Sequence, residues 1–485
     1  MAGDEVAAAV AANKLILHSV YLGGFLVWLL HLFELVVLRP KRLRSKLQKQ
    51  GIEGPPPSFL LGNLPAMRKS LIQHKTQSST ETRTSCDVDV ASWQIYVCGL
   101  AHKQQLCITD VEVLKEIGFC KSLNLGKSSL PSTIGGPLFW QGLLSSNGII
   151  WAHQGKIIAL ELYLDKVKGG LAEIRVDQNL RNLSADIIAR ACFRSSYHEG
   201  EEIFVKFRAL KKVVNKGMMG TPGFRLLPTK DNREIWRLEK EVESMILKLV
   251  KQRVEALNEK DLLQMILEGA KSSADYNGLS HNKFIVDNCT TLFFAGHETI
   301  ASTASWSLML LAAHPDWQAR VRAEVLEICG DKPLNNETLR KMKVLKMVIK
   351  EVLRLYAPAV FVTREALETV TLKNVVIPKG VQLQIRVPFL HQNPDLWGLN
   401  AHQFNPERFA NGILAACQSS QAYMPFGNGP RICVGRHLAM TELKVMLALI
   451  LSKFSFSLSP TYQRSPVYTM VVEREHGIIL HATRV

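Results

Sequence analysis

The stretch that decides the fold is Phe426-Gly427-Asn428-Gly429-Pro430-Arg431-Ile432-Cys433-Val434-Gly435. Its glycines and its proline predict a tight loop, because glycine adopts positive φ angles and lets the backbone approach a flat ligand, whereas proline fixes φ. A helical pattern follows from His437, so the loop delivers Cys433 to the start of a helix. Free N–H groups and the dipole at a helix start stabilise a thiolate at this cysteine.

A thiolate is a soft, strong metal ligand. When it holds haem iron it supplies electron density that favours cleavage of the O–O bond. Arg431, two residues before the cysteine, is placed to neutralise a haem carboxylate. The alternative is a buried cysteine without a chemical role, which is the usual fate of a free cysteine. Other patterns in the chain decide between the two.

The composition is that of a large globular chain. Its 485 residues are 47% hydrophobic and 21% charged, which excludes a disordered chain, collagen and a disulfide miniprotein. The nine cysteines are scattered and include no C-x-x-C pair, which argues against a disulfide framework or a zinc ribbon and indicates a reducing compartment. The net charge of +16 favours an anionic membrane surface, nucleic acid or an acidic protein as a partner.

The most apolar segment, Leu15–Leu38, contains Glu34 as its one charged residue. As a helix it would be about 36 Å long, enough to cross a hydrocarbon core of about 30 Å. A cleaved signal peptide is the alternative, but the segment is too long and no small-residue cleavage site follows it. Six basic residues between Arg39 and Lys49 come next and should stay cytosolic. They point to membrane lipid as the partner and not to nucleic acid.

The chain therefore divides into three expected parts. Residues 1–38 are a membrane anchor, residues 39–57 a basic and proline-rich linker, and residues 58–485 the catalytic domain. The linker ends in Gly54-Pro55-Pro56-Pro57, which cannot continue a helix and is expected to set the angle between anchor and body.

Helical patterns dominate the body. Residues with helical spacing predict helices over Trp236–Lys251, Asn282–Ala313, Trp317–Cys329, Leu345–Tyr356 and His437–Phe454. Strand signals cluster in Gln94–Thr109 and in Thr369–Val387, where Pro and Gly supply turns. The fold class predicted is mainly α with a small β subdomain, preceded by one transmembrane helix.

On these residues the chain resembles the cytochrome P-450 haem-thiolate monooxygenases. Their signature F-x-x-G-x-R-x-C-x-G is matched at Phe426, Gly429, Arg431, Cys433 and Gly435. Five fixed positions match by chance with a probability of about 10⁻⁴ in a chain of this length. The resemblance implies the cytochrome P-450 fold, haem as cofactor, Cys433 as the iron ligand, and cofactor contacts from the other four residues. It covers almost all of residues 58–485.

A second pattern implied by the resemblance is a structural network. Glu351 and Arg354 lie three residues apart on one helix face, where an ion pair alone contributes only tenths of a kcal/mol. In the family these residues form a buried network with the arginine of a later P-E-R-F stretch, here Arg408. We interpret the network as a scaffold for the loop Phe426–Gly435, called the haem loop below. A solvated salt bridge is the alternative.

A third pattern lies on the long helix, in Ala295-Gly296-His297-Glu298-Thr299. Glycine inside a helix costs about 1 kcal/mol relative to alanine, and a groove for dioxygen and substrate at Ala295 and Gly296 is one explanation. Close helix packing is the other. The resemblance assigns Glu298 and Thr299 to catalytic proton delivery, with a local bond from Thr299 to the preceding turn as the simpler interpretation.

Further contacts follow from the resemblance. Arg364 matches a second arginine for the haem carboxylates, and Ala359 and Val360, just before it, belong to a segment that usually touches substrate. Trp151 opens the family's W-x-x-x-R clamp, but Gly155 stands where the arginine should be. A charge-assisted hydrogen bond of about 1.5–3 kcal/mol is therefore expected to be missing, while the Trp151 N–H can still contribute.

The expected function is a monooxygenase that inserts one oxygen atom from dioxygen into a lipophilic small molecule. The finer resemblance is to the plant branch that oxidises gibberellin-type diterpenoids; neighbouring branches act on cytokinins or brassinosteroids. The chain also looks short between Met67 and Val90 and near residues 168–175. A truncated or decaying copy that binds haem without catalysis is therefore the alternative from another class.

The implied partners are dioxygen, the lipophilic substrate, membrane lipid and an NADPH-dependent reductase that supplies electrons. Arg431, Arg436 and Lys444 are expected to meet the acidic docking face of that reductase. The expected location is the endoplasmic reticulum membrane, single-pass, with the catalytic domain in the cytosol.

Overall fold

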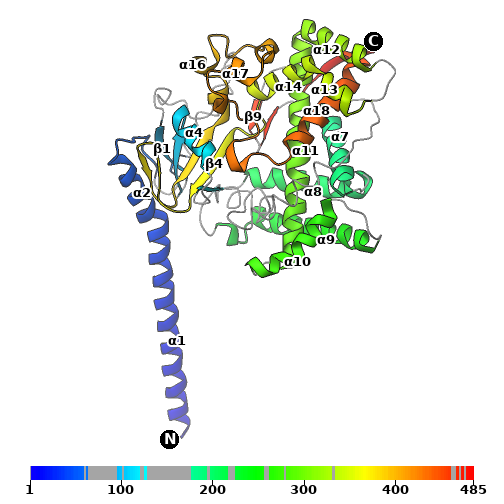
Figure 1. Cartoon of the computed structure of the whole chain (residues 1–485). Coiled ribbons are helices and arrows are strands. Elements are labelled where there is room, and N and C mark those ends of the chain that lie inside the picture. The colour runs from blue at the N-terminus through cyan, green and yellow to red at the C-terminus, as the bar shows by residue number, and fades with distance from the viewer. Residues whose placement is uncertain are drawn as a thin grey trace.

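The computed structural model shows a rounded body from which one long helix projects (Figure 1). The residues that it describes are 2–58, 62–63, 95–100, 103–120, 125–127, 176–193, 197–216, 224–255, 262–277, 280–329, 334–459, 466–468, 471–474 and 477–484. The body is mainly helical and carries small sheets, as the sequence predicts.

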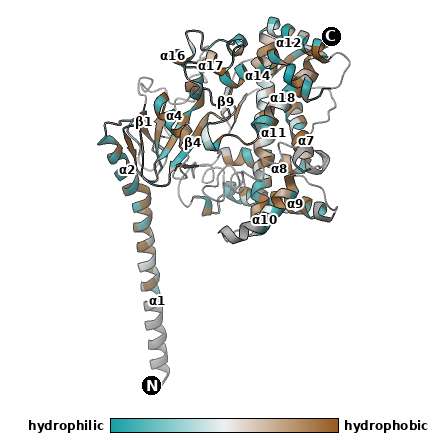
Figure 2. Ribbon diagram, in the orientation of Figure 1, coloured by the Kyte–Doolittle hydropathy of each residue, from teal (hydrophilic) through white to brown (hydrophobic). Residues whose placement is uncertain are grey.

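The N-terminal segment forms one continuous rod. Helix α1, Ala2–Phe33, runs through a π-helical stretch, Glu34–Leu38, into α2, Arg39–Gln48. Figure 2 shows apolar residues along the part of α1 nearest the body. Within the described residues, His18–Gln48 is the segment long and apolar enough to cross a membrane; its most apolar stretch of 18 residues has a mean hydropathy of 2.0 and is not buried against the body. The helix therefore continues past Leu38, and much of the basic segment expected to be linker is helical.

The body holds this rod at α2. Leu47 is fully buried, and Arg44 Nη2 donates hydrogen bonds to the carbonyls of Gly54 (2.7 Å) and Pro55 (2.8 Å). Val97 N in the first strand donates to Glu53 O (2.9 Å). The proline-rich stretch is thus fixed against the sheet, and the angle of the anchor is set by this docking as well as by the stiffness of the prolines.

The main sheet has five strands in the order β1-β2-β7-β4-β3. Their bounds are Ile95–Leu100 (β1), Lys103–Ile108 (β2), Leu125–Lys127 (β3), Phe361–Ala366 (β4) and Gln382–Arg386 (β7). The β1–β2 hairpin pairs Cys98 with Gln105, and β2 lies parallel to β7 with Gln105 opposite Gln382. Segments more than 270 residues apart in sequence thus form one sheet, which places Arg364 of β4 near the haem loop.

Helix α11, His281–Ala313, passes through the middle of the body (Figure 1). Ser280 caps its start by accepting a hydrogen bond from Lys283 N (3.3 Å), and it ends where His314 precedes a proline, as the sequence predicts. Twenty-four of its residues are buried, because two apolar clusters share it. The first cluster joins its second half to α12, α14 and α18, and the second joins its first half to α7, α8, α9 and α10.

The other helices surround this axis. Their bounds are Val111–Phe119 (α4), Val176–Phe193 (α7), Tyr197–Lys216 (α8), Lys230–Glu255 (α9), Leu262–Asn277 (α10), Pro315–Cys329 (α12), Asn336–Lys341 (α13), Lys343–Leu355 (α14), Val387–His391 (α15), Pro394–Trp397 (α16), Ile413–Ala416 (α17) and Arg436–Leu451 (α18). Short 3₁₀ turns lie at Phe224–Leu226, Pro406–Phe409, Ser420–Ala422 and Gly429–Arg431.

Three small strand pairs complete the fold. They are β5 (Val370–Leu372) with β6 (Val375–Ile377), β8 (Phe454–Leu458) with β11 (Leu480–Arg484), and β9 (Pro466–Tyr468) with β10 (Val472–Arg474). The prediction of helix up to Phe454 was wrong by three residues, because Phe454 pairs with Arg484 as the first residue of β8.

A buried carboxyl group joins α7 to α18. Glu442 of α18 is fully buried and accepts a hydrogen bond from Ser184 Oγ (2.7 Å). Burial raises the pKa of Glu442 to about 8, although the Ser184 hydrogen bond partly opposes the rise. The group is therefore mostly protonated in the folded protein near neutral pH.

We expect the stability that Glu442 contributes to be fully present below its unfolded pKa near 4.5 and to be lost as the pH rises towards about 8, at up to about 1.4 kcal/mol per pH unit. Thermal unfolding of Glu442→Gln over this range should show a weaker dependence on pH than the parent chain shows. Glu337→Gln, an exposed glutamate of α13, is the control. The same pH dependence in the parent and in Glu442→Gln would contradict the prediction.

Candidate haem-thiolate site

The glycine-rich loop turns tightly before α18. Gly427 and Gly429 have positive φ angles of 74° and 68°, and Cys433 N donates to Phe426 O (2.8 Å). Helix α18 begins at Arg436, with Gly435 at its N-cap, so Cys433 lies just ahead of the helix start, as the loop pattern predicts. The Cys433 side chain is exposed in the described structure.

One glycine of the loop has a role that the sequence did not indicate. A Cβ atom at Gly429 would lie 2.2 Å from the carbonyl oxygen of Gly118 in α4, closer than any side chain can approach. Gly429 is therefore needed for packing against α4 as well as for its positive φ. The motif alone suggested only close approach to a flat ligand, because the partner Gly118 lies some 300 residues away in sequence.

Two arginines lie close together beside the loop. Arg364 of β4 is buried; burial and the charge of Arg431 lower the pKa of Arg364 to about 10, and burial also lowers the pKa of Arg431. A buried cation and a half-buried one repel each other unless an anion joins them. This arrangement fits the carboxylates of haem, and Cys433 could supply the thiolate for its iron.

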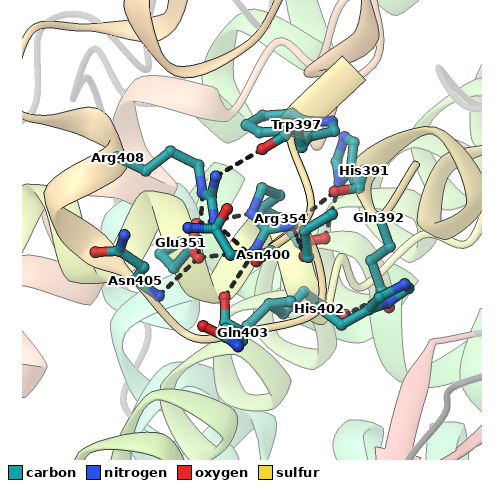
Figure 3. A network of polar contacts seen from close by, with 12 residues as sticks. Glu351, Arg354, His391, Gln392, Trp397, Asn400, His402, Gln403, Asn405 and Arg408 are labelled. Carbon is teal, nitrogen blue, oxygen red and sulfur yellow. Dashed lines mark hydrogen bonds and ion pairs between the residues drawn. The ribbon is translucent and has the colours of Figure 1, made fainter. Parts of the chain in front are cut away.

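The structure brings Glu351, Arg354 and Arg408 together (Figure 3). Glu351 and Arg354 are completely buried and form a two-pronged ion pair, with Nε–Oε2 and Nη2–Oε1 distances of 2.8 and 2.7 Å. Arg354 also donates to three backbone carbonyls, those of His391, Ala401 and Gln403.

The third member of the network binds mainly to the backbone. Arg408 lies 3.7 Å from Glu351 Oε1 and donates to the carbonyls of Trp397 (2.9 Å) and Asn400 (3.0 Å). Asn405 N donates to Glu351 Oε1 (2.9 Å). The network thus fixes the irregular chain between α14 and the haem loop, and it is buried, not a solvated salt bridge.

Glu298 lies in a buried cluster of charges. Its carboxylate contacts Lys211 Nζ of α8 (2.8 Å), His297 Nε2 (3.3 Å) and Arg181 Nε of α7 (3.9 Å). Burial alone would raise the pKa of Glu298, but the His297 hydrogen bond and the charges of Lys211 and Arg181 outweigh it and hold the pKa well below its ordinary value. The carboxylate is therefore ionised at neutral pH, and it accepts hydrogen bonds instead of donating a proton.

The sequence analysis missed both cations. Lys211 follows Phe204 and Phe207 on the apolar side of α8 at helical spacing, and all three are buried. A lysine on the buried face of a helix calls for an anionic partner, and this was the available signal. No local pattern indicated that this partner is Glu298 of α11.

Thr299 and Gly296 are both held by local contacts. Thr299 Oγ1 donates to Ala295 O (2.8 Å), which is the local bond to the preceding turn given above as the alternative to proton delivery. A Cβ at Gly296 would lie 2.6, 2.9 and 3.3 Å from three carbon atoms of Ile188 in α7. Close packing of α7 on α11 therefore explains this glycine, and a groove is not needed to do so. Ala295, Gly296 and Thr299 are half-buried, whereas Glu298 is buried.

Three segments distant in sequence meet at Val472, among them the segment before Arg364 that was expected to touch substrate. The Val472 amide donates to Pro358 O (3.1 Å), and its carbonyl accepts from Ser302 Oγ (2.5 Å) and Trp306 Nε1 (3.2 Å) of α11. Next to this junction, Val360 is buried and Ala359 is exposed. The C-terminal strands, the long helix and the segment before Arg364 are thus joined.

Two expectations turn out differently or fall outside the described part. Trp151 and Gly155 lie outside the described residues, as do the apparent gaps at 67–90 and 168–175. The expectation that Lys444 meets a reductase was wrong, because this lysine is buried and donates to Leu339 O. Burial also lowers the pKa of Lys444.

The family model named Cytochrome P450 matches residues 155–482, which include the Cys433 loop and the buried network. The chain belongs to the cytochrome P450 family. This P450 is therefore a haem-thiolate monooxygenase, and Cys433 is the cysteine that the family signature places on the iron.

Plant P450s align with nearly the whole chain. Cytochrome P450 714C2 of rice (Oryza sativa subsp. japonica) is 43% identical, with 93% of this chain and 94% of the relative covered. Cytochrome P450 714B2 of rice is 39% identical over 99% of both chains, and Cytochrome P450 714A2 of Arabidopsis thaliana is 39% identical over 93% of this chain and 95% of its own. The first alignment spans 496 positions, more than the 485 residues of this P450, so the relative carries residues that this chain lacks.

Replacing Arg354 with leucine should destabilise this P450 by about 3–5 kcal/mol, because it leaves the buried Glu351 charge without its partner. Arg320→Leu is the matched control, since Arg320 pairs with Glu407 at 2.9 Å on the surface and its loss should cost at most about 1 kcal/mol. Thermal unfolding and haem retention measure both. Similar losses for the two variants would show that burial of the network is unimportant.

Gly296→Ala should cost about 1–3 kcal/mol in the parent chain, because the new methyl group overlaps Ile188. In an Ile188→Ala background the same change should cost nothing or should stabilise, since alanine favours a helix over glycine by about 1 kcal/mol. A double-mutant cycle on thermal unfolding measures the coupling. Equal costs in the two backgrounds would count against the packing explanation.

Proposed function

We propose that this P450 is a membrane-anchored monooxygenase that inserts one oxygen atom from dioxygen into a plant hormone of the gibberellin-type diterpenoid class. The observation that carries the chemistry is the Cys433 loop, in which an exposed thiol lies two residues from Arg431, whose charge acts on the buried Arg364. When bound at Cys433, haem supplies the iron centre at which dioxygen is activated.

The chain's own groups have distinct roles in this proposal. Arg364 and Arg431 bind the haem carboxylates, while Phe426, Gly429 and Gly435 shape the loop around the porphyrin. The Thr299 hydroxyl holds and passes a proton at Oγ1 on the half-buried side of α11. Glu298, kept ionised by Lys211, His297 and Arg181, orients water by accepting hydrogen bonds at its carboxylate.

Two observations support a lipophilic hormone as the substrate. The segments that join at Val472 include Val360 and Ala359, and they present aliphatic side chains and few charges. The finer sequence resemblance is to the gibberellin-oxidising branch, and the relatives that align over more than nine-tenths of the chain are plant P450s. Cytokinins and brassinosteroids are the competing hormone classes.

The N-terminal rod supports single-pass anchoring in the endoplasmic reticulum membrane. The body does not cover its most apolar stretch, and Arg44 holds its basic end on the body. Basic residues beside a membrane span favour the cytosolic side, so we expect the domain that follows them to lie there, where an NADPH-dependent reductase can supply electrons. Arg436, at the start of α18 near Cys433, is exposed and remains a proposed docking contact.

The proposal is tested on full-length protein expressed with ample haem precursor. The reduced, carbon monoxide-bound spectrum should show thiolate ligation, and Cys433→Ser should lose it. Titration with a gibberellin, a brassinosteroid and a cytokinin should then shift the haem spectrum with the gibberellin alone, and the reductase should support its oxidation.

Three other outcomes would contradict parts of the proposal. A colourless protein would refute haem-thiolate chemistry. A thiolate spectrum without reductase-supported turnover of any hormone would establish the impaired haem protein suggested by Gly155 and the short segments. Turnover of a different hormone would overturn the substrate assignment.

Thr299→Ala should uncouple electron consumption from oxidation. Product formed per NADPH consumed should fall by about tenfold or more, since a positioned proton donor contributes about 10²- to 10⁴-fold. Thr303→Ala is the control, because Thr303 makes the same kind of bond one turn along α11, to Thr299 O at 2.9 Å, and is buried. Unchanged coupling in Thr299→Ala would remove this residue from the proton path.

A further inference from the structure

His391, the last residue of α15, has both ring nitrogens engaged between the buried network and the haem loop. Nδ1 lies 3.0 Å from Arg354 O at the end of α14, and Met424 N donates to Nε2 at 2.9 Å. In return, Arg354 Nη1 donates to His391 O at 2.7 Å. The side chain is completely buried. Figure 3 shows it beside Arg354 and Trp397.

The hydrogen bonds fix the tautomer of this ring. A backbone N–H can only donate, so Nε2 must be the acceptor from Met424, and the single proton of a neutral imidazole must lie on Nδ1. Burial lowers the pKa of His391 to about 3, a shift partly opposed by the hydrogen bond to Arg354 O, so the ring stays neutral. Nδ1–H then satisfies a carbonyl at the C-terminal end of α14, where carbonyls lack helical partners.

Met424 is the point from which the haem loop departs. Its carbonyl accepts from Gly427 N (3.0 Å), which begins the loop, and two residues later Phe426 O accepts from Cys433 N (2.8 Å). The ring is also held in place, because Tyr423 stacks on it at 5.4 Å and Tyr423 OH donates to Lys350 O of α14 (2.9 Å). An unbroken set of hydrogen bonds thus runs from Glu351 through Arg354 and His391 to the loop.

We propose that His391 is a positioning residue for the iron ligand: by accepting the Met424 N–H it fixes the base of the haem loop and hence the place of the Cys433 sulfur. This inference rests on the proposed haem-thiolate function. The ring itself is too far along the chain of bonds to be a reacting group, and it acts through Met424. We expect its replacement to lower the share of protein in which the thiolate binds the iron, and not merely the stability of the fold.

Two substitutions separate the two ring nitrogens. Glutamine can place an acceptor oxygen near the position of Nε2, whereas asparagine reaches only the position of Nδ1. His391→Asn should therefore show a larger share of protein without thiolate ligation in the reduced carbon monoxide spectrum, and about tenfold faster transfer of haem to an acceptor protein, the effect of one buried hydrogen bond. His391→Gln should restore the parent spectrum and most of the haem retention.

The control is His402→Asn, on the same irregular segment, where the exposed ring lies 3.3 Å from Gln392 Oε1 and should be replaceable without effect. Circular dichroism of each variant reports folding separately. The proposal is overturned if His391→Asn matches the parent, or if His391→Gln is no better than His391→Asn. It stands if glutamine rescues what asparagine loses, even where asparagine yields little holoprotein. Failure of the unmodified chain to show thiolate ligation would instead refute the proposed function.

Discussion

The ion pair between Glu351 and Arg354 is wholly removed from water, and the haem side of the molecule depends on it. Removing two charges from solvent is costly unless every remaining donor and acceptor finds a partner. Here the guanidinium satisfies the carboxylate twice and then three backbone carbonyls, and the carboxylate also accepts the Asn405 amide. Because these partners belong to chain without regular secondary structure, the pair determines where that chain runs.

This constraint reaches the loop that carries Cys433, the proposed iron ligand, through hydrogen bonds and not through apolar contact alone. The segment from His391 to Arg408 wraps around the pair, and Met424 then starts the loop that carries Cys433. A loop with two positive-φ glycines has little stiffness of its own. Its shape is set at one end by His391, at the other by α18, and along its side by Gly118 of α4.

Helix α11 separates two kinds of environment. Its half-buried positions include Ala295 and Thr299, while Glu298 faces the cations of α7 and α8. The same turn of helix therefore offers a hydroxyl toward the less buried side and a fixed negative charge within the core. Packing of Ile188 against Gly296 brings α7 close enough for Arg181 to approach that charge.

The sequence by itself determined the parts that depend on neighbours along the chain. These are the family signature around Cys433, the helical spacing of α9, α11, α12 and α14, and the long apolar N-terminal helix, whose patterns are local. Four features are visible only in the folded chain. Lys211 pairs with Glu298, and Gly429 packs on Gly118. Lys444 is buried, and His391 joins Arg354 to Met424. The physical reason is that each of these contacts joins residues far apart in sequence, and no periodicity or short motif encodes which distant side chain will fill a given site.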